Sequence, residues 1–247
     1  MTDLLVMVPT RGRRAQCERL LGSFRETASP GTDIAVILDP DDEGTYDGAD
    51  WGDALRAVLA PRGTLADKLN QVAGAMTGTY PALMWCGDDH VFGTPGWDKL
   101  MLAALEDMGG HGWVYPDTVR RRDVPEIWMC SSSVTEALGW FFPPFLAQYY
   151  GDNAIGELAK RAGLIRGCPE AKAEHLHYSV RKETEHDATY REAEDAHGTA
   201  DLAAFRRWQA DVLPYEVSRL RRRFNTDVEW VISRISARDP EGARCPA

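Results

Sequence analysis

The stretch Ala82-Leu-Met-Trp-Cys-Gly-Asp-Asp-His90 decides how this chain of 247 residues folds. Residues 82–86 form an unbroken apolar run, which is typical of a strand buried on both faces of a parallel sheet. Gly87, Asp88 and Asp89 follow this run directly. In parallel sheets, ligands bind beyond the carboxyl ends of the strands, so polar side chains at this point predict a binding site.

Two segments nearer the amino terminus show the same pattern of an apolar run followed by polar residues. The apolar run 4–8 ends at Pro9 and is followed by Thr10 and Arg11, and the run 34–38 is followed by an acidic cluster that begins at Asp39. Helical spacing of apolar residues appears at 15–25, 65–76 and 97–108, whereas 54–59 fits either a short helix or a strand. Alternating strands and helices predict an α/β fold with a mostly parallel, Rossmann-like sheet covered by helices on both faces.

The second half of the chain is less regular. Segments 113–116, 127–130 and 173–178 are expected to be strands, the first two short. Residues 154–162 predict a helix that ends at Gly163, and 201–235 predict further helix. We therefore expect one domain over residues 1–185, with halves at about 1–100 and 101–185, and a helical C-terminal extension over 186–247.

Composition narrows the class of protein. The chain has 38 acidic and 28 basic residues, for a formal charge of −10, which argues against a broad nucleic-acid-binding surface. It has no apolar run long enough for a transmembrane helix and no signal-peptide pattern at its start, so a cytoplasmic location is expected.

Missing sequence motifs exclude further classes of protein. The five scattered cysteines contain no CxxC pair, so neither a zinc site nor a disulfide framework is expected. Dinucleotide-binding, P-loop, zinc-protease and serine-hydrolase motifs are all missing.

The order of the polar motifs is informative. It runs, in sequence order, through Pro9-Thr10-Arg11, Asp39, a helix with Lys68 and Asn70, Gly87-Asp88-Asp89, Pro95-Gly96-Trp97, Gly151-Asp152-Asn153 and Glu174-His175-Leu-His177. Over about residues 4–180 this order resembles the GT-A-fold glycosyltransferases, in particular the inverting members similar to family 2. The resemblance implies a GT-A fold, with a nucleotide-sugar half followed by an acceptor half.

The resemblance also implies roles for individual residues. The donor pocket would be formed by Pro9, Thr10, Arg11, Asp39, Lys68, Asn70 and Asp88. The D-x-D motif that holds a divalent metal falls on Asp88 and Asp89, but its usual first acid falls on Gly87, so metal binding is assigned to Asp89. A late metal-binding histidine corresponds to His175 or His177, and Asp152 corresponds to the general base at the start of the acceptor-side helix.

Chemistry supports this assignment independently. A diphosphate leaving group cannot approach several carboxylates in an acidic protein unless a cation lies between them. Carboxylate oxygens suit Mg²⁺, and an imidazole ligand favours Mn²⁺. At a helix start, Asp152 would stay ionised and could accept the proton of the attacking hydroxyl, which displaces the diphosphate with inversion.

Plainer structural interpretations stand beside these roles. Asp88 and Asp89 could be solvated loop acids, and Asp152 could be a helix N-cap. Asp39 could be a turn residue, and Arg11 and Lys68 could be solvated charges. Arg13 and Arg14 are expected at the surface. The aromatic stretch 140–150 is expected in the core, although Trp140 or Tyr149 could border the acceptor.

The substrates are less defined. The donor is expected to be a UDP- or GDP-sugar. Usage rich in Arg, Ala and Gly and poor in Lys is typical of a GC-rich bacterial genome, such as an actinobacterial one, or of a bacteriophage, where a modified DNA base or a protein would be an acceptor. The basic cluster at Arg219 and Arg221–Arg223 is either a docking surface for such an acceptor or a solvated helix end. The alternative functions are a sugar-phosphate nucleotidyltransferase, whose glycine-rich loop is missing, and a non-catalytic nucleotide-sugar-binding module.

Overall fold

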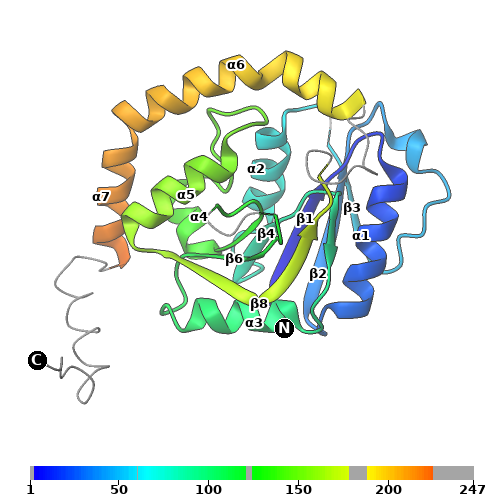
Figure 1. Ribbon diagram of the computed structural model, residues 1–247, viewed down its shortest axis with the longest axis horizontal. Helices are drawn as coiled ribbons and strands as arrows, with labels where there is room; N and C mark the ends of the chain where they lie inside the picture. The colour runs from blue at the N-terminus through cyan, green and yellow to red at the C-terminus, as the bar shows by residue number, and fades with distance from the viewer. Residues whose placement is uncertain (1–2, 60, 121–123, 178–187, 225–247) are drawn as a thin grey trace, which may run out of the picture.

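The computed structural model describes residues 3–59, 61–120, 124–177 and 188–224, and within these ranges the chain forms an eight-stranded sheet between helices (Figure 1). The strands are β1 Leu4–Pro9, β2 Thr32–Leu38, β3 Leu55–Val58, β4 Ala82–Trp85, β5 His90–Phe92, β6 Trp113–Asp117, β7 Trp128–Ser131 and β8 Ile165–His175. The helices are α1 Arg14–Thr27, α2 Leu65–Met76, α3 Trp97–Glu106, α4 Ser132–Leu138, α5 Gly151–Ala162, α6 Ala188–Asp211 and α7 Leu213–Phe224.

The sheet has a parallel half and a mixed half. Its strand order is β3-β2-β1-β4-β7-β6-β8-β5. Strands β3, β2, β1 and β4 are parallel, and Met7 of β1 pairs with Ala35 of β2 on one side and with Trp85 of β4 on the other. Strand β7 is antiparallel to both of its neighbours, whereas β6 and β8 are parallel. The parallel sheet predicted from the sequence is therefore found in the amino-terminal half, among β3, β2, β1 and β4. The carboxyl ends of these strands lie along one edge of the sheet.

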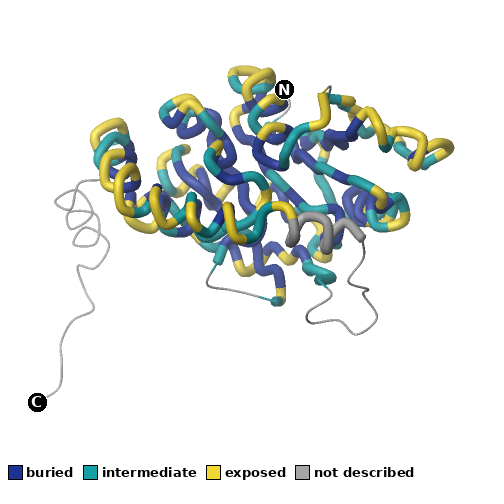
Figure 2. Tube along the Cα trace, turned by 90° about the horizontal axis from the view of Figure 1, so that it is seen from above, coloured by how far each residue is buried: buried dark blue, intermediate teal, exposed yellow. Residues whose placement is uncertain are grey.

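Both faces of the sheet are covered, as the unbroken apolar strands predict. Leu5 and Met7 of β1 belong to a core that includes residues of α2, α4, α5 and α7. Leu4, Val6 and Val8 belong to a second core with α1 and α3. Seen from above, the strands are buried in the interior and the outward sides of the helices are exposed (Figure 2).

Several boundaries differ from the sequence expectation. Residues 55–58 are a strand, which pairs with β2 at the edge of the sheet. Strand β8 begins at Ile165 rather than near 173, because its first part pairs with β6 and its last part with β5. The predicted C-terminal helix is two helices, and α6 begins at Ala188. Residue 178 of the predicted strand and residues 225–235 of the predicted helix lie outside the described ranges.

The C-terminal helices are packed onto the rest of the chain. Helix α6 runs across the top of Figure 1 and meets α7, which lies beside α5. Trp208, Leu213 and Leu220 are buried in the core that also contains α2 and α5. The side chain of Asp201 accepts hydrogen bonds from the backbone N–H groups of residues 147, 148 and 149 at 2.8–2.9 Å. Among the described residues, no helix is long and apolar enough to cross a membrane.

Candidate functional site

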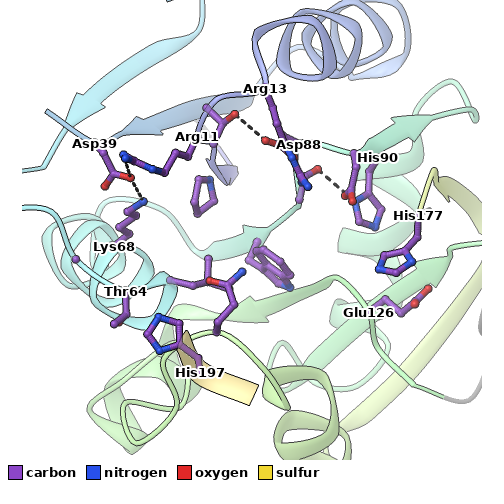
Figure 3. A pocket seen from close by; sticks show the side chains of 18 of the residues that line it. Arg11, Arg13, Asp39, Thr64, Lys68, Asp88, His90, Glu126, His177 and His197 are labelled. Carbon is purple, nitrogen blue, oxygen red and sulfur yellow. Dashed lines mark hydrogen bonds and ion pairs between the residues drawn. The ribbon is translucent and has the colours of Figure 1, made fainter. Parts of the chain in front are cut away.

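A cavity of about 290 Å³ lies at the carboxyl ends of β1, β2 and β4 (Figure 3). Of the predicted site residues, those that line it are Pro9, Thr10, Arg11, Asp39, Lys68, Asp88, Asp89, His175 and His177. Asn70 and Asp152 do not line it. The apolar runs predicted a binding site at the carboxyl ends of these strands, and the polar side chains do meet there.

One corner of the cavity is built around Asp39, which is fully buried. Its Oδ2 accepts a hydrogen bond from Nζ of Lys68 at 2.7 Å and lies 3.3 Å from Nη1 of Arg11. Arg11 also forms a two-pronged ion pair with Asp41 at 2.8 Å, which raises the pKa of its guanidinium above the usual value. Lys68 is only 8% exposed, so its interpretation as a solvated charge is wrong. The Oδ1 atom of Asp39 is buried and has no hydrogen-bond partner among the described residues.

Asp88 is tied to the loop after β1. Its Oδ2 accepts a hydrogen bond from Oγ1 of Thr10 at 2.7 Å, and its Oδ1 lies 3.3 Å from Nη1 of Arg13. Burial is the main reason why the pKa of Asp88 rises to about 6. The prediction that Arg13 lies at the surface is wrong, because its side chain turns inward to this buried carboxylate and is 8% exposed. Arg14 is half-buried and pairs with Glu18.

A candidate metal centre is formed by Asp89, His90 and His175. One possible ligand atom from each residue lies within 4.8 Å of those of the other two. The Oδ1 atom of Asp89 is 3.1 Å from Nδ1 of His90, and its Oδ2 is 3.3 Å from Nε2 of His175. The two imidazole rings are stacked with their centroids 4.2 Å apart. A carboxylate and two imidazoles are a donor set for a divalent first-row transition metal.

The protonation states of Asp89 and His90 fit a cation. Burial opposes the charge of Asp89, but the contacts with His175 and His90 outweigh it and hold the pKa of this carboxyl below its usual value. Burial lowers the pKa of His90. Its Nε2 atom is buried, and the part of the chain that the structure describes offers it no hydrogen-bond partner. Because buried polar atoms are nearly always satisfied, this nitrogen is consistent with a ligand that the protein binds.

Gly87 explains the departure from the usual metal motif. A Cβ atom at this position would lie 2.8 Å from Oδ1 of Asp89 and 3.2 Å from Nδ1 of His90. Any larger residue would therefore collide with the candidate ligands themselves. The side chains of Asp89 and His90 therefore occupy the volume that an acidic side chain at position 87 would need.

A second carboxylate, Glu126, lies on the far side of His175. It is buried, and its Oε1 is 3.4 Å from Nδ1 of His175. Burial opposes both charges of this pair, yet the pKa of Glu126 falls to about 2 and that of His175 rises to about 9, because each lies against opposite charge. His177 meets the ring of His175 edge-on at 5.1 Å, and burial lowers its pKa to about 4. Of the two predicted histidines, the described cluster contains His175, and His177 lies beside it.

The two predicted residues outside the cavity lining have different surroundings. The Asn70 side chain donates a hydrogen bond to the carbonyl oxygen of Phe142, and its Oδ1 accepts from the N–H groups of Phe141 and Phe142. The Asn70 amide was expected to contact the nucleotide, but in the structure it hydrogen-bonds to the backbone of Phe141 and Phe142 and so holds this loop in place. Asp152 is half-buried in the first turn of α5, and its Oδ1 accepts from the N–H of Asn153 at 2.8 Å.

The aromatic stretch and the basic cluster mostly hold helices in place. Phe145 stacks on Trp208, and Tyr150 stacks on Phe205. The indole N–H of Trp140 points to Glu216 at 3.3 Å. Two arginines of the basic cluster are also engaged, since Arg219 donates to the carbonyl of residue 137 and Arg221 to that of residue 161. Among the described residues, the cavity wall includes the aromatic side chain of Trp85.

Several cavity residues were not predicted from the sequence. They are Arg13, Arg62, Gly63, Thr64, Leu65, Trp85, His90, Glu126, Gln148, Ala196 and His197. His90 follows Asp89 directly, so a ligand next to the motif could have been considered. Glu126 and His197 follow no motif or periodic pattern, and only the folded chain brings them to the cavity. Ala196 and His197 show that α6 forms part of its wall.

Comparisons with known proteins find relatives by structure and not by sequence. No protein-family model matches the chain, and no curated protein sequence matches it. It is similar to the mannosyltransferase PcManGT from Pyrobaculum calidifontis, with a TM-score of 0.59 and 15% identity over 97% of this chain and 76% of that one. It is also similar to glucosyl-3-phosphoglycerate synthase from Mycobacterium tuberculosis, with a TM-score of 0.55 and 11% identity over 82% and 79% of the two chains.

A third similar structure is residues 1–349 of S. aureus TarS, with a TM-score of 0.51 and 12% identity. The match covers 70% of this chain, which spans 60% of that one. Identities this low relate the proteins by fold. The fold expected from the order of the sequence motifs is confirmed: the chain has the GT-A fold of nucleotide-sugar-dependent glycosyltransferases.

Proposed function

We propose that the protein is a metal-dependent glycosyltransferase that moves a sugar from a nucleotide diphosphate-sugar to an acceptor hydroxyl, with inversion. The observation that carries this proposal is the convergence of Asp89, His90 and His175 at one end of the cavity. The similar structures support it, because the mannosyltransferase was solved with GDP-Man and Mn²⁺ and the synthase with UDP and Mn²⁺. The donor is accordingly of the UDP or GDP type.

Asp89, His90 and His175 would hold the cation. When bound there, Mn²⁺ or Mg²⁺ neutralises the charge that develops on the departing diphosphate. Asp89 lies in the loop after β4, His90 begins β5 and His175 ends β8. Strands β5 and β8 pair His90 directly with His175, so their backbone hydrogen bonds fix the distance between the two imidazoles.

The opposite corner suits the nucleoside. The Oδ1 of buried Asp39 has no partner within the described ranges, and a nucleobase N–H is a fitting donor for it. Lys68 and Arg11 hold the other oxygen of this carboxylate and so orient it. Thr10 and Arg13 hold Asp88 in the same way, between this corner and the candidate metal centre. Uracil and guanine both present such an N–H group.

Asp152 is the proposed general base. It lies in the first turn of α5, where the helix dipole favours the carboxylate form. The segment that leads into α5 includes Gln148, which lines the cavity. Because the side chain of Asp152 lies outside the cavity lining, the acceptor hydroxyl is expected to approach from beside the donor cavity.

The test is release of UDP or GDP from a panel of their sugars in the presence of Mn²⁺, with water or an added acceptor. The wild-type protein should release one of these nucleotides, and Asp89→Asn should lose this activity. Asp107→Asn is the matched control, because Asp107 is an exposed acid that pairs with Arg166 far from the cavity lining. Turnover that survives Asp89→Asn, or release of pyrophosphate from a nucleoside triphosphate instead, would refute the proposal.

A further inference from the structure

We infer that Glu126 is a positioning residue, which holds His175 so that its Nε2 faces Asp89 and thereby sets the affinity of the cation site. This inference rests on the proposed function, because it concerns the same metal centre. Glu126 lies between β6 and β7, away from the motifs of the donor pocket. It is 7% exposed and lines the cavity, as His175 does, and Figure 3 shows it near His177.

The carboxylate of Glu126 is itself firmly held. Its Oε2 accepts a hydrogen bond from Oγ1 of Thr118 at 2.5 Å, and its Oε1 accepts one from Nη1 of Arg120. The same Oε1 lies 3.4 Å from Nδ1 of His175, an ion-pair contact that is slightly longer than a hydrogen bond. Glu126 therefore contacts both the segment after β6, through Thr118 and Arg120, and the end of β8, through His175.

This arrangement determines which nitrogen of His175 is available. A neutral imidazole has one nitrogen that donates and one that accepts, and the hydrogen bond of the first determines the role of the second. With Glu126 facing Nδ1, a proton belongs on Nδ1, and Nε2, which lies 3.3 Å from Asp89, is the nitrogen that a cation would take. A carboxylate behind a metal-binding histidine commonly fixes its tautomer and orientation in this way.

The contacts of Glu126 argue against its acting as the general base. Thr118, Arg120 and His175 surround its two oxygens, so an acceptor hydroxyl would have to displace one of them. Glu126 also lies outside the described group of atoms that could share one cation. Its role is thus exerted through His175.

The first measurement is the affinity for Mn²⁺ alone, from the electron paramagnetic resonance signal of free Mn²⁺ titrated with the full chain. Glu126→Ala should weaken binding by about 10–100-fold, the usual cost of losing the group behind a metal-binding histidine. Glu126→Gln should lose less, because its amide oxygen still accepts from Nδ1. Glu106→Ala is the control, because Glu106 is exposed at the end of α3. The inference is overturned if a folded Glu126→Ala variant binds Mn²⁺ within twofold of the wild type.

A second measurement reads the tautomer directly. Nitrogen-15 histidine spectra of the Mg²⁺-bound protein should place the proton of His175 on Nδ1, and Glu126→Gln should keep it there. Glu126→Ala should give a mixture of tautomers, which a purely structural role of Glu126 would not produce. If the wild type binds Mn²⁺ and both variants match it in affinity and tautomer, this inference alone fails. If the wild type itself binds no Mn²⁺, the proposed function fails and the inference with it.

Discussion

Gly87 shows how a single missing side chain can make room for a candidate metal site. The space that its Cβ would occupy is filled by Oδ1 of Asp89 and Nδ1 of His90. The motif resemblance located Asp89 but placed an acid before it, and nothing in the sequence indicates that His90 takes up that space. The candidate ligand set is therefore Asp89, His90 and His175, whereas the sequence predicted Asp89 with His175 or His177.

The first prediction concerns this close contact. Gly87→Ala should lower the affinity for Mn²⁺ at least about 10-fold, because small displacements of metal ligands are costly. Gly93→Ala is the matched control, since its nearest neighbour would be the carbonyl oxygen of Lys172 at 3.9 Å, an ordinary contact. Titration of both variants with Mn²⁺ measures the difference. Equal affinities would contradict the crowding that the structure shows at Gly87.

A second prediction concerns pH in the metal-free protein. The pKa of Glu126 is lowered from 4.5 to about 2, so its contribution to stability is complete above pH 4.5 and is lost as the pH falls toward 2. The pKa of His175 is raised from 6.5 to about 9, so its contribution is complete below pH 6.5 and is lost as the pH rises through 9. Their ion pair should therefore stabilise the fold most between pH 4.5 and 6.5.

Urea unfolding in a chelator tests this window. Glu126→Gln should reduce the free energy of unfolding by about 1–3 kcal/mol near the middle of the window, and by less at about pH 10. The opposite trend, with a larger loss at high pH, would show that the two side chains do not form the ion pair.

A third prediction addresses Asp152. Asp152→Asn should reduce the rate of sugar transfer by about 10²–10⁴-fold, the usual contribution of a general base. Its affinity for the nucleotide should stay within about twofold of the wild type, because Asp152 does not line the donor cavity. Steady-state kinetics and calorimetry on the same sample separate the two effects. An unchanged rate would remove Asp152 from the mechanism.

At the scale of elements, α6 connects the C-terminal part of the chain to the cavity. Its Ala196 and His197 line the wall, and Asp201, one turn after His197, binds three successive backbone N–H groups of the segment before α5. The carbonyl of Ala147 in that segment accepts from the N–H of Leu65 at the start of α2. Helices α6 and α2 thus meet through one short loop beside the cavity.

The fourth prediction follows from these bonds. Asp201→Ala should lower the free energy of unfolding by about 2–4 kcal/mol, because it leaves backbone donors without their acceptor. Asp201→Asn should lose less, since its side chain keeps one acceptor oxygen. Asp211→Ala is the control, because Asp211 is exposed at the end of α6 and should change stability by about 0.5 kcal/mol or less. Similar losses for Asp201→Ala and Asp211→Ala would contradict the anchoring role.

Elements with a strong local signal could be predicted from the sequence. The apolar runs located β1, β2 and β4, and the helical spacing located α2 from Leu65 to Met76. The start of β8 and the inward turn of Arg13 could not be predicted, because both depend on partners far along the chain. Glu126 and His197 were missed for the same reason. Long-range contacts determine their place, and a single sequence carries no pattern for them.

At the scale of the whole molecule, burial also predicts thiol chemistry. Burial raises the pKa of the Cys17 thiol to about 12 and also raises the pKa values of Cys86 and Cys130 above the usual range. As a fifth prediction, peptides that contain these three cysteines should remain unmodified by iodoacetamide in the folded protein and become labelled in urea. Mass spectrometry measures both states. Full labelling of Cys130 before unfolding would contradict the described core.

Some of the acidic residues behind the negative net charge lie close together in the folded chain. Within the formal charge of −10, Asp39, Asp88 and Asp89 all come together at one cavity. Arg11, Lys68 and Arg13 compensate the first two, and two imidazoles lie against the third. The Asp89 side of the cavity is therefore where a cation would allow a diphosphate to bind.

The most direct test of the central claim is calorimetry of UDP and GDP binding to the wild type and to Asp89→Asn, with and without Mn²⁺. Our account predicts that one nucleotide binds the wild type at least about 10-fold more tightly with Mn²⁺, and that Asp89→Asn abolishes this gain. A folded wild-type protein that binds neither nucleotide, or that binds equally well with and without Mn²⁺, would contradict the account.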